Sequence, residues 1–196
     1  MEAHTHSKLS NNKLTLREVT LFGMLGGIMY ASKAMMEFAP NVHLIGVFTV
    51  ALTVVYRWKA LYPIYTFVLV TGLANGFGIW WYPYLYTWAV LFGMTMLLPR
   101  KMPKAVAPVV YCIVCGLHGY LYGTIYAPYQ ALAFHMSFKG TVAWVIAGLP
   151  WDFVHGTSNL ICGILITPLI HLLKKAETVI APKCVNCKSK CNPFDY

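Results

Sequence analysis

The chain has 196 residues, of which 58% are apolar and only 11% are charged, and its formal net charge is +9. A soluble domain of this size carries roughly a quarter charged residues, and disorder is excluded for the bulk of so apolar a chain. Because a transmembrane helix needs about 20 apolar residues, the chain has room for six or seven such helices and for no separate catalytic domain. The composition therefore predicts an all-α integral membrane protein that functions within its helix bundle.

Six apolar runs are expected to form a compact bundle of transmembrane helices. In chain order, we place these helices at residues 16–38, 43–56, 60–76, 85–98, 107–125 and 143–173. A longer connection is expected at residues 126–141, before the last helix. Residues 16–175 then form the transmembrane domain, and we expect the segments 1–15 and 176–196 to lie in the cytoplasm.

The positions of the basic residues predict how the helices are oriented. With six spans and a cytoplasmic N-terminus, every Lys and Arg except Lys33 and Lys139 falls on the cytoplasmic side. This bias in short loops follows the positive-inside rule, whereas five spans would place the C-terminal lysines outside. The sequence therefore predicts a multi-pass membrane protein with both termini in the cytoplasm. Membrane topology explains the positive charge, so no nucleic-acid partner is expected.

The last predicted helix carries the strongest group of polar residues. Asp152, His155 and Asn159 are spaced i, i+3 and i+7, so they fall within about 60° of one another on one helix face. Polar groups inside a bilayer are costly and are candidates for function by default. Two interpretations are open. Either these side chains contact a polar ligand, so that Asp152→Asn and His155→Ala both weaken binding, or they form a buried network in which Asp152 pairs with His155.

Further candidates lie near the predicted outer ends of the helices. Lys33 and Glu37 are one turn apart on the first helix, where an i, i+4 ion pair is the simpler interpretation and a place in a binding cavity the alternative. Asn41 and His43 follow in a loop, where their side chains either satisfy backbone groups or meet a ligand from outside. The other candidates are polar or aromatic residues that can stack on a flat ring or belong to the interfacial belt: Trp81, Tyr84, Tyr126 and Gln130.

Two remaining patterns concern partners and metals. Small residues at four-residue spacing on the first helix, Gly23, Gly27 and Ala31, allow another helix to approach closely, either within the bundle or from a partner protein. The C-terminal cysteines Cys184, Cys187 and Cys191 lack an obvious fourth ligand, so we favour a basic tail near acidic lipid headgroups over a metal site. The sequence contains no ATP-binding loop and no zinc-protease motif. We therefore assign no catalytic residue, metal or cofactor.

These features together resemble the substrate-binding S component of energy-coupling factor (ECF) transporters. The resemblance covers about residues 14–175 and rests on six short spans, the small-residue stripe of the first helix, the turn at Pro40 and Asn41, and the run 148–159. It implies a protein of the bacterial cytoplasmic membrane that is not an enzyme. It also implies capture of a vitamin or related micronutrient from outside, with a transmembrane coupling (T) protein and two cytoplasmic ATPases as partners.

The resemblance also implies roles for particular residues. In this family an alanine-rich stripe on the first helix docks the coupling protein, and here Gly23, Gly27 and Ala31 stand at the matching positions. The family's binding site is formed by the outer halves of the last three helices and the loops over them, which implies residues 80–86 and 126–135 together with the Asp152 face.

Two other functions stay open at this stage. A small polytopic membrane enzyme would use Asp152 and His155 as acid and base on a lipid-like substrate. A scaffold protein would use the same polar groups only to hold helices together, and it would bind no small ligand.

Overall fold

A computed structural model describes residues 14–180, and every regular element in this part of the chain is a helix. The predicted all-α fold is therefore confirmed for these residues. The segments 1–13 and 181–196 lie outside the described residues. The prediction for Cys184, Cys187 and Cys191 falls on the second of these segments.

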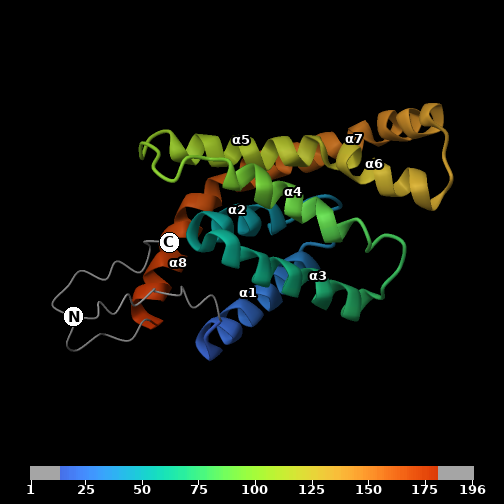
Figure 1. The fold of residues 1–196 in the computed structure, drawn as a ribbon. Coiled ribbons are helices and arrows are strands. Elements are labelled where there is room, and N and C mark those ends of the chain that lie inside the picture. Colours follow the sequence, from blue (N-terminus) through green and yellow to red (C-terminus); the bar gives the residue numbers. More distant parts are fainter. Residues whose placement is uncertain (1–13, 181–196) are drawn as a thin grey trace, which may run out of the picture.

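The helices follow one another with short connections (Figure 1). In chain order they are α1 (Leu16–Met35), α2 (Ile45–Tyr56), α3 (Leu61–Asn75), α4 (Tyr84–Met96), α5 (Ala107–Tyr120), α6 (Tyr122–Ala133), α7 (Phe138–Cys162) and α8 (Ile166–Ile180). Short 3-10 helices at Arg57–Ala60 and Gly163–Leu165 connect α2 to α3 and α7 to α8.

The structure corrects two of the predicted boundaries. The connection expected at residues 126–141 is largely helical, because α6 continues to Ala133 and α7 begins at Phe138. Packing explains the difference: Tyr126 stacks on Trp144 of α7, with ring centroids 6.0 Å apart. The predicted last helix is divided, since the 3-10 turn Gly163–Leu165 separates α7 from α8.

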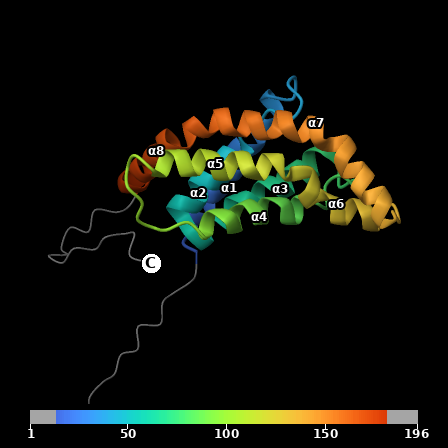
Figure 2. The ribbon, with the colours of Figure 1, turned by 90° about the horizontal axis from the view of Figure 1, so that it is seen from above.

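Within residues 14–180, three joined helices are long and apolar enough to cross a membrane: Ile45–Asn75, Ala107–Ala133 and Phe138–Thr178. The first is not straight, because Arg57 has φ 52° and ψ −126°, and the chain turns back there so that α2 and α3 run in opposite directions (Figure 1). In the third, α8 leaves α7 at a steep angle and crosses one end of the bundle, which both views show (Figures 1 and 2).

The centre of the bundle is α2, nine of whose 12 residues are buried. A helix that is apolar all round is typical of a position surrounded by other helices. Here α2 lies among α4, α5, α7 and α8. Its hydroxyl groups remain inside, and Thr53 satisfies its own by donating to the Thr49 carbonyl at 2.6 Å. The large apolar side chains of the core, among them Met29, Phe67 and Leu91, pack around this helix.

A second packing centre joins α5 to α7, which lie side by side in both views (Figures 1 and 2). The two helices approach through glycines: a Cβ added at Gly119 would lie 2.7 Å from the Gly156 Cα, and one at Gly156 would overlap the Tyr120 ring. The buried residues of α7 are only Asp152, His155, Gly156 and Asn159. Its apolar side chains point outward, as expected of a helix that faces lipid.

This contact predicts that Gly156→Ala destabilises the bundle by about 1–3 kcal/mol, because the added methyl group has no space against Tyr120. Gly148→Ala is the matched control on the same helix, since a Cβ there would meet nothing within 4 Å. We expect the control to leave the melting temperature of the detergent-solubilised protein unchanged or slightly raised, by the higher helix propensity of alanine. Equal melting temperatures for the two variants would contradict the packing described here.

Candidate functional site

Five aromatic rings from five different elements form a closed circuit inside the bundle. His43 precedes α2, Trp88 belongs to α4, His118 to α5, Tyr122 to α6 and His155 to α7. The ring centroids of His43 and His155 are 4.8 Å apart, as are those of Tyr122 and His155. The circuit closes through Trp88 and His118, with separations of 5.8 Å, 5.8 Å and 5.9 Å. We call these five residues the ring cluster; all separations are typical of favourable aromatic contacts.

The ring cluster contains an unusual number of unpaired polar atoms. Trp88, His118 and His155 are at most 2% exposed. Among the described residues, no hydrogen-bond partner is found for His43 Nδ1, Trp88 Nε1, His118 Nδ1 or His155 Nε2, nor for the adjacent Thr87 Oγ1 and Asn159 Oδ1. Each buried polar group left unpaired costs roughly 1–3 kcal/mol, and nearly all such groups in native proteins are paired. Their concentration at one place indicates a site that accepts a polar partner.

Hydrogen bonding fixes the chemical character of two of these atoms. His118 Nε2 lies 3.0 Å from the Thr87 carbonyl oxygen, which can only accept, so Nε2 carries the proton. The unpaired Nδ1 of the neutral ring is then an acceptor. The indole Nε1–H of Trp88 is a donor. The site therefore presents at least one donor and one acceptor on adjacent rings.

Asn159 adds a second acceptor one turn along α7 from His155. Its amide nitrogen donates to the Cys115 carbonyl at 3.4 Å, which leaves the oxygen as the unpaired atom. The side chain is fully buried and lies against Gly46 and Gly119, where a Cβ would come within 3.4 Å and 2.9 Å of it. Close packing thus holds the Asn159 amide in a fixed orientation.

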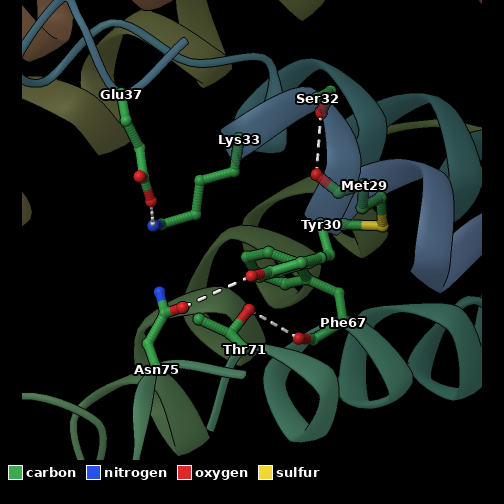
Figure 3. A network of polar contacts seen from close by, with 8 residues as sticks. All are labelled: Met29, Tyr30, Ser32, Lys33, Glu37, Phe67, Thr71 and Asn75. Carbon is green, nitrogen blue, oxygen red and sulfur yellow. Dashed lines mark hydrogen bonds and ion pairs between the residues drawn. The ribbon is translucent and has the colours of Figure 1, made fainter. Parts of the chain in front are cut away.

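The two charged residues expected near the outer end of the first helix are paired with each other. Lys33 and Glu37 form the predicted ion pair on and just beyond α1, with Nζ and Oε1 3.2 Å apart (Figure 3). In the same region Tyr30 donates to Asn75 Oδ1 at 3.3 Å and joins α1 to α3. The i, i+4 interpretation of Lys33 and Glu37 is confirmed.

The predicted polar face of the last helix is confirmed, but its internal pairing is not observed. Asp152, His155 and Asn159 are 7%, 2% and 0% exposed, so all three point into the bundle. Asp152 does not bond to His155. Its two carboxylate oxygens instead accept from the Gly123 backbone N–H, at 3.0 and 3.1 Å. This contact lies at the first turn of α6.

The other predicted residues lie at different distances from the ring cluster. Tyr84 contacts Trp88, and Tyr126 contacts Tyr122, with ring centroids 5.7 and 6.1 Å apart, so both lie at its rim. The Asn41 carbonyl accepts from the Ser158 hydroxyl at 3.0 Å. This bond joins the loop before α2 to α7.

Trp81 and Gln130 are not brought into the ring cluster. Trp81 donates to the Val68 carbonyl at 2.8 Å and fixes the α3–α4 connection to α3. Gln130 lies on α6 about two turns beyond Tyr122, toward the end of the α6–α7 hairpin. Their contact with a ligand stays a prediction.

Three residues of the ring cluster were not assigned to the site from the sequence. In the sequence, Trp88 resembles an aromatic residue of the membrane interface. His118 resembles a histidine whose two ring nitrogens are hydrogen-bonded within the bundle, although in the structure only its Nε2 has a partner. No pattern in the sequence identifies Tyr122 by itself as a site residue. The i, i+4 spacing of Tyr84 and Trp88 places these two rings on one face of α4. His118 and Tyr122 have the same spacing across the short break between α5 and α6, and their rings are in contact. This spacing is the pattern that can identify them.

Two surface grooves lie away from the ring cluster. A surface groove of about 530 Å³ runs along α3 between Trp58 and Leu69, and a smaller one of about 270 Å³ lies between α2 and α8. Both are lined by mostly apolar side chains and include no residue of the ring cluster, so they fit lipid chains better than a polar compound. Within residues 14–180, no group of His, Cys, Asp and Glu side chains has the arrangement of a metal site.

Comparison with protein-family models, with curated proteins and with solved structures finds no match to the chain. The chemistry of the ring cluster is therefore the basis for inferring a function.

The unpaired nitrogen of His155 has a measurable consequence for stability. Because His155→Leu removes a buried polar atom and keeps similar volume, we expect the ligand-free variant to unfold at the same or a higher temperature than the wild type. Thr157→Val is the control: it removes a satisfied hydrogen bond to Tyr120 OH, 3.0 Å long, and should cost about 1 kcal/mol. A larger loss for His155→Leu than for Thr157→Val would mean that protein contacts hold the imidazole.

Proposed function

We propose that the chain is a membrane-embedded substrate-binding subunit, the S component of an ECF-type importer, which captures a small heterocyclic micronutrient from outside the cell. The observation that carries the proposal is the ring cluster, where six buried polar atoms without partners gather around five rings. Small-molecule sites combine aromatic walls with a few polar groups in this way.

The ring cluster also limits the chemistry of the ligand. Ring faces favour a flat, conjugated compound. Trp88 offers a donor, whereas His118 Nδ1 and Asn159 Oδ1 offer acceptors. Since the described charged groups nearby are paired or bound to backbone, an uncharged ligand fits best; a charged group would remain uncompensated at this depth.

The arrangement of the helices supports a six-span topology. In Figure 1, α1, α3 and α5 run in one direction, and α2, α4 and α7 run in the other. The basic residues of the start of α1, the α2–α3 turn, the α4–α5 connection and α8 therefore lie at one end of the bundle: Arg17, Arg57, Lys59, Arg100, Lys101, Lys104, Lys174 and Lys175. The positive-inside rule makes this end cytoplasmic. The ring cluster then lies in the outer half, where a ligand from outside arrives first.

The surface of α1 supports the proposal that a partner protein docks there. Gly26 packs on α3, where a Cβ would lie 2.6 Å from the Thr66 side chain. Gly23 and Gly27 face away from the bundle, with nothing within 4 Å of an added Cβ, and Ala31 is exposed on the same side. This open stripe suits the close approach of a coupling-protein helix. Cytoplasmic ATPases would supply the energy.

The alternative of an acid–base enzyme is less favoured by the geometry. An acid–base pair needs both groups within reach of the same reacting atom. The Asp152 carboxylate instead faces the Gly123 N–H, and the His155 imidazole faces the rings of His43 and Tyr122.

The proposal is tested by mass spectrometry of small molecules released from the protein after purification from cells grown in rich medium. We expect close to one molecule of a single heterocyclic compound per chain from the wild type, and at least about tenfold less from Asn159→Leu, which removes a buried acceptor. Trp151→Leu, which alters an exposed side chain on the same helix, is the control and should retain the compound. Release of lipid alone from all three proteins would contradict the proposal.

A further inference from the structure

We propose that Asp152 is a positioning residue: it caps the N-terminus of α6 and so holds Tyr122 in the binding site, without contacting the ligand. This inference rests on the proposed function only in calling the ring cluster a binding site. The cap itself is a property of the fold.

The first observation concerns the break between α5 and α6. The backbone at Leu121 has φ −94° and ψ 0°, so α5 ends at Tyr120 and a new helix begins at Tyr122. The first N–H groups of any helix lack partners within that helix and carry the positive end of its dipole. No side chain of α6 itself caps this terminus. The Asp152 carboxylate from α7 does so, by accepting from the Gly123 N–H with both oxygens.

The second observation is that a side chain at residue 123 would displace the Asp152 carboxylate. A Cβ there would overlap one Asp152 carboxylate oxygen and lie 3.1 Å from the carboxyl carbon. Glycine therefore allows the carboxylate to approach the backbone directly. The match between a glycine and a buried acid on two different helices indicates that the contact is a specific feature of the fold.

The third observation is how the charge of Asp152 is compensated. The residue is 7% exposed, and among the described residues it belongs to no ion pair. A buried carboxylate needs strong hydrogen bonds in place of water, and a helix N-terminus provides them. Because both oxygens are directed at Gly123, the carboxylate is already occupied by the backbone.

The consequence for the site follows from the neighbours of this contact. Tyr122 directly precedes Gly123, and His155 lies one turn beyond Asp152 on α7. The rings of Tyr122 and His155 are in contact, with centroids 4.8 Å apart. The cap thus fixes α6 to α7 immediately beside the point where their two rings meet.

Two substitutions, Asp152→Asn and Asp152→Leu, distinguish a helix-capping role of this residue from a direct contact with the ligand. Asparagine retains an acceptor oxygen and is about as good a helix cap as aspartate, whereas leucine has similar volume and no acceptor. For purified, ligand-free protein we expect Asp152→Asn to keep the wild-type near-ultraviolet circular dichroism, which reports the packing of all aromatic side chains, Tyr122 and Trp88 among them. Asp152→Leu should change this spectrum. Leu149→Ala, which shortens an exposed side chain on the same helix, is the control and should keep it.

Binding is then measured with the mixture of small molecules released by heat from the wild-type protein. Asp152→Asn should retain the bound compound within about twofold, and Asp152→Leu should retain at least about fivefold less. If Asp152→Leu does not fold, Gly123→Ala replaces it, because the added methyl group displaces the same carboxylate and should change the spectrum in the same direction.

The results separate this proposal from the proposed function. Loss of the compound in Asp152→Asn with an unchanged spectrum would overturn the positioning role and make Asp152 a ligand contact. An unchanged spectrum in Asp152→Leu or Gly123→Ala would show that the cap does not hold Tyr122. If the wild type releases no compound, the proposed function fails, and the spectra of the variants still decide whether the cap exists.

Discussion

A bilayer offers no water to its interior, so every polar group placed there must find its partner within the protein or in a ligand. Most of the polar groups described here obey this constraint locally. Thr53, Thr71 and Thr95 donate to the carbonyl four residues earlier in their own helices. Lys33 pairs with Glu37, and Asp152 binds the start of α6. Against this background the unpaired atoms of the ring cluster stand out, and the proposed function rests on them.

Close packing of α5 against α7 makes this arrangement possible. Without side chains at Gly119 and Gly156, the two backbones approach closely enough for Asn159 to reach the Cys115 carbonyl. At the start of α6, the lack of a side chain at Gly123 lets Asp152 reach its backbone N–H. The contact between α5 and α7 turns the apolar side chains of α7 toward the outside. In α7 the polar residues face the bundle and the apolar residues face outward, and such a helix is stable only where lipid surrounds it. The fold therefore requires a lipid environment.

The sequence predicts those features that depend on one helix at a time. Apolar runs locate α1 to α5, and the i, i+3, i+7 spacing correctly places Asp152, His155 and Asn159 on one buried face. It does not predict contacts between helices. The pairing of Asp152 with Gly123 joins residues 29 positions apart, and the stacking of Tyr126 on Trp144 holds a helix where a loop was expected.

The same limit explains the residues missed at the site. Trp88 was indistinguishable from the interfacial aromatics beside it until its burial was known, because hydropathy does not report which side of a short helix faces inward. His118 has one satisfied nitrogen and one unpaired nitrogen, and this difference depends on the position of Thr87 in another helix.

The central claim, that the ring cluster is where a small molecule binds, is tested most directly by an experimental density map of the protein purified from rich medium. The account predicts density that no protein atom explains, lying against the rings of His43, Trp88 and His155 and within hydrogen-bond distance of the His118 Nδ1 atom. Rings in mutual contact with no such density, in a sample that mass spectrometry shows to carry a bound compound, would contradict it.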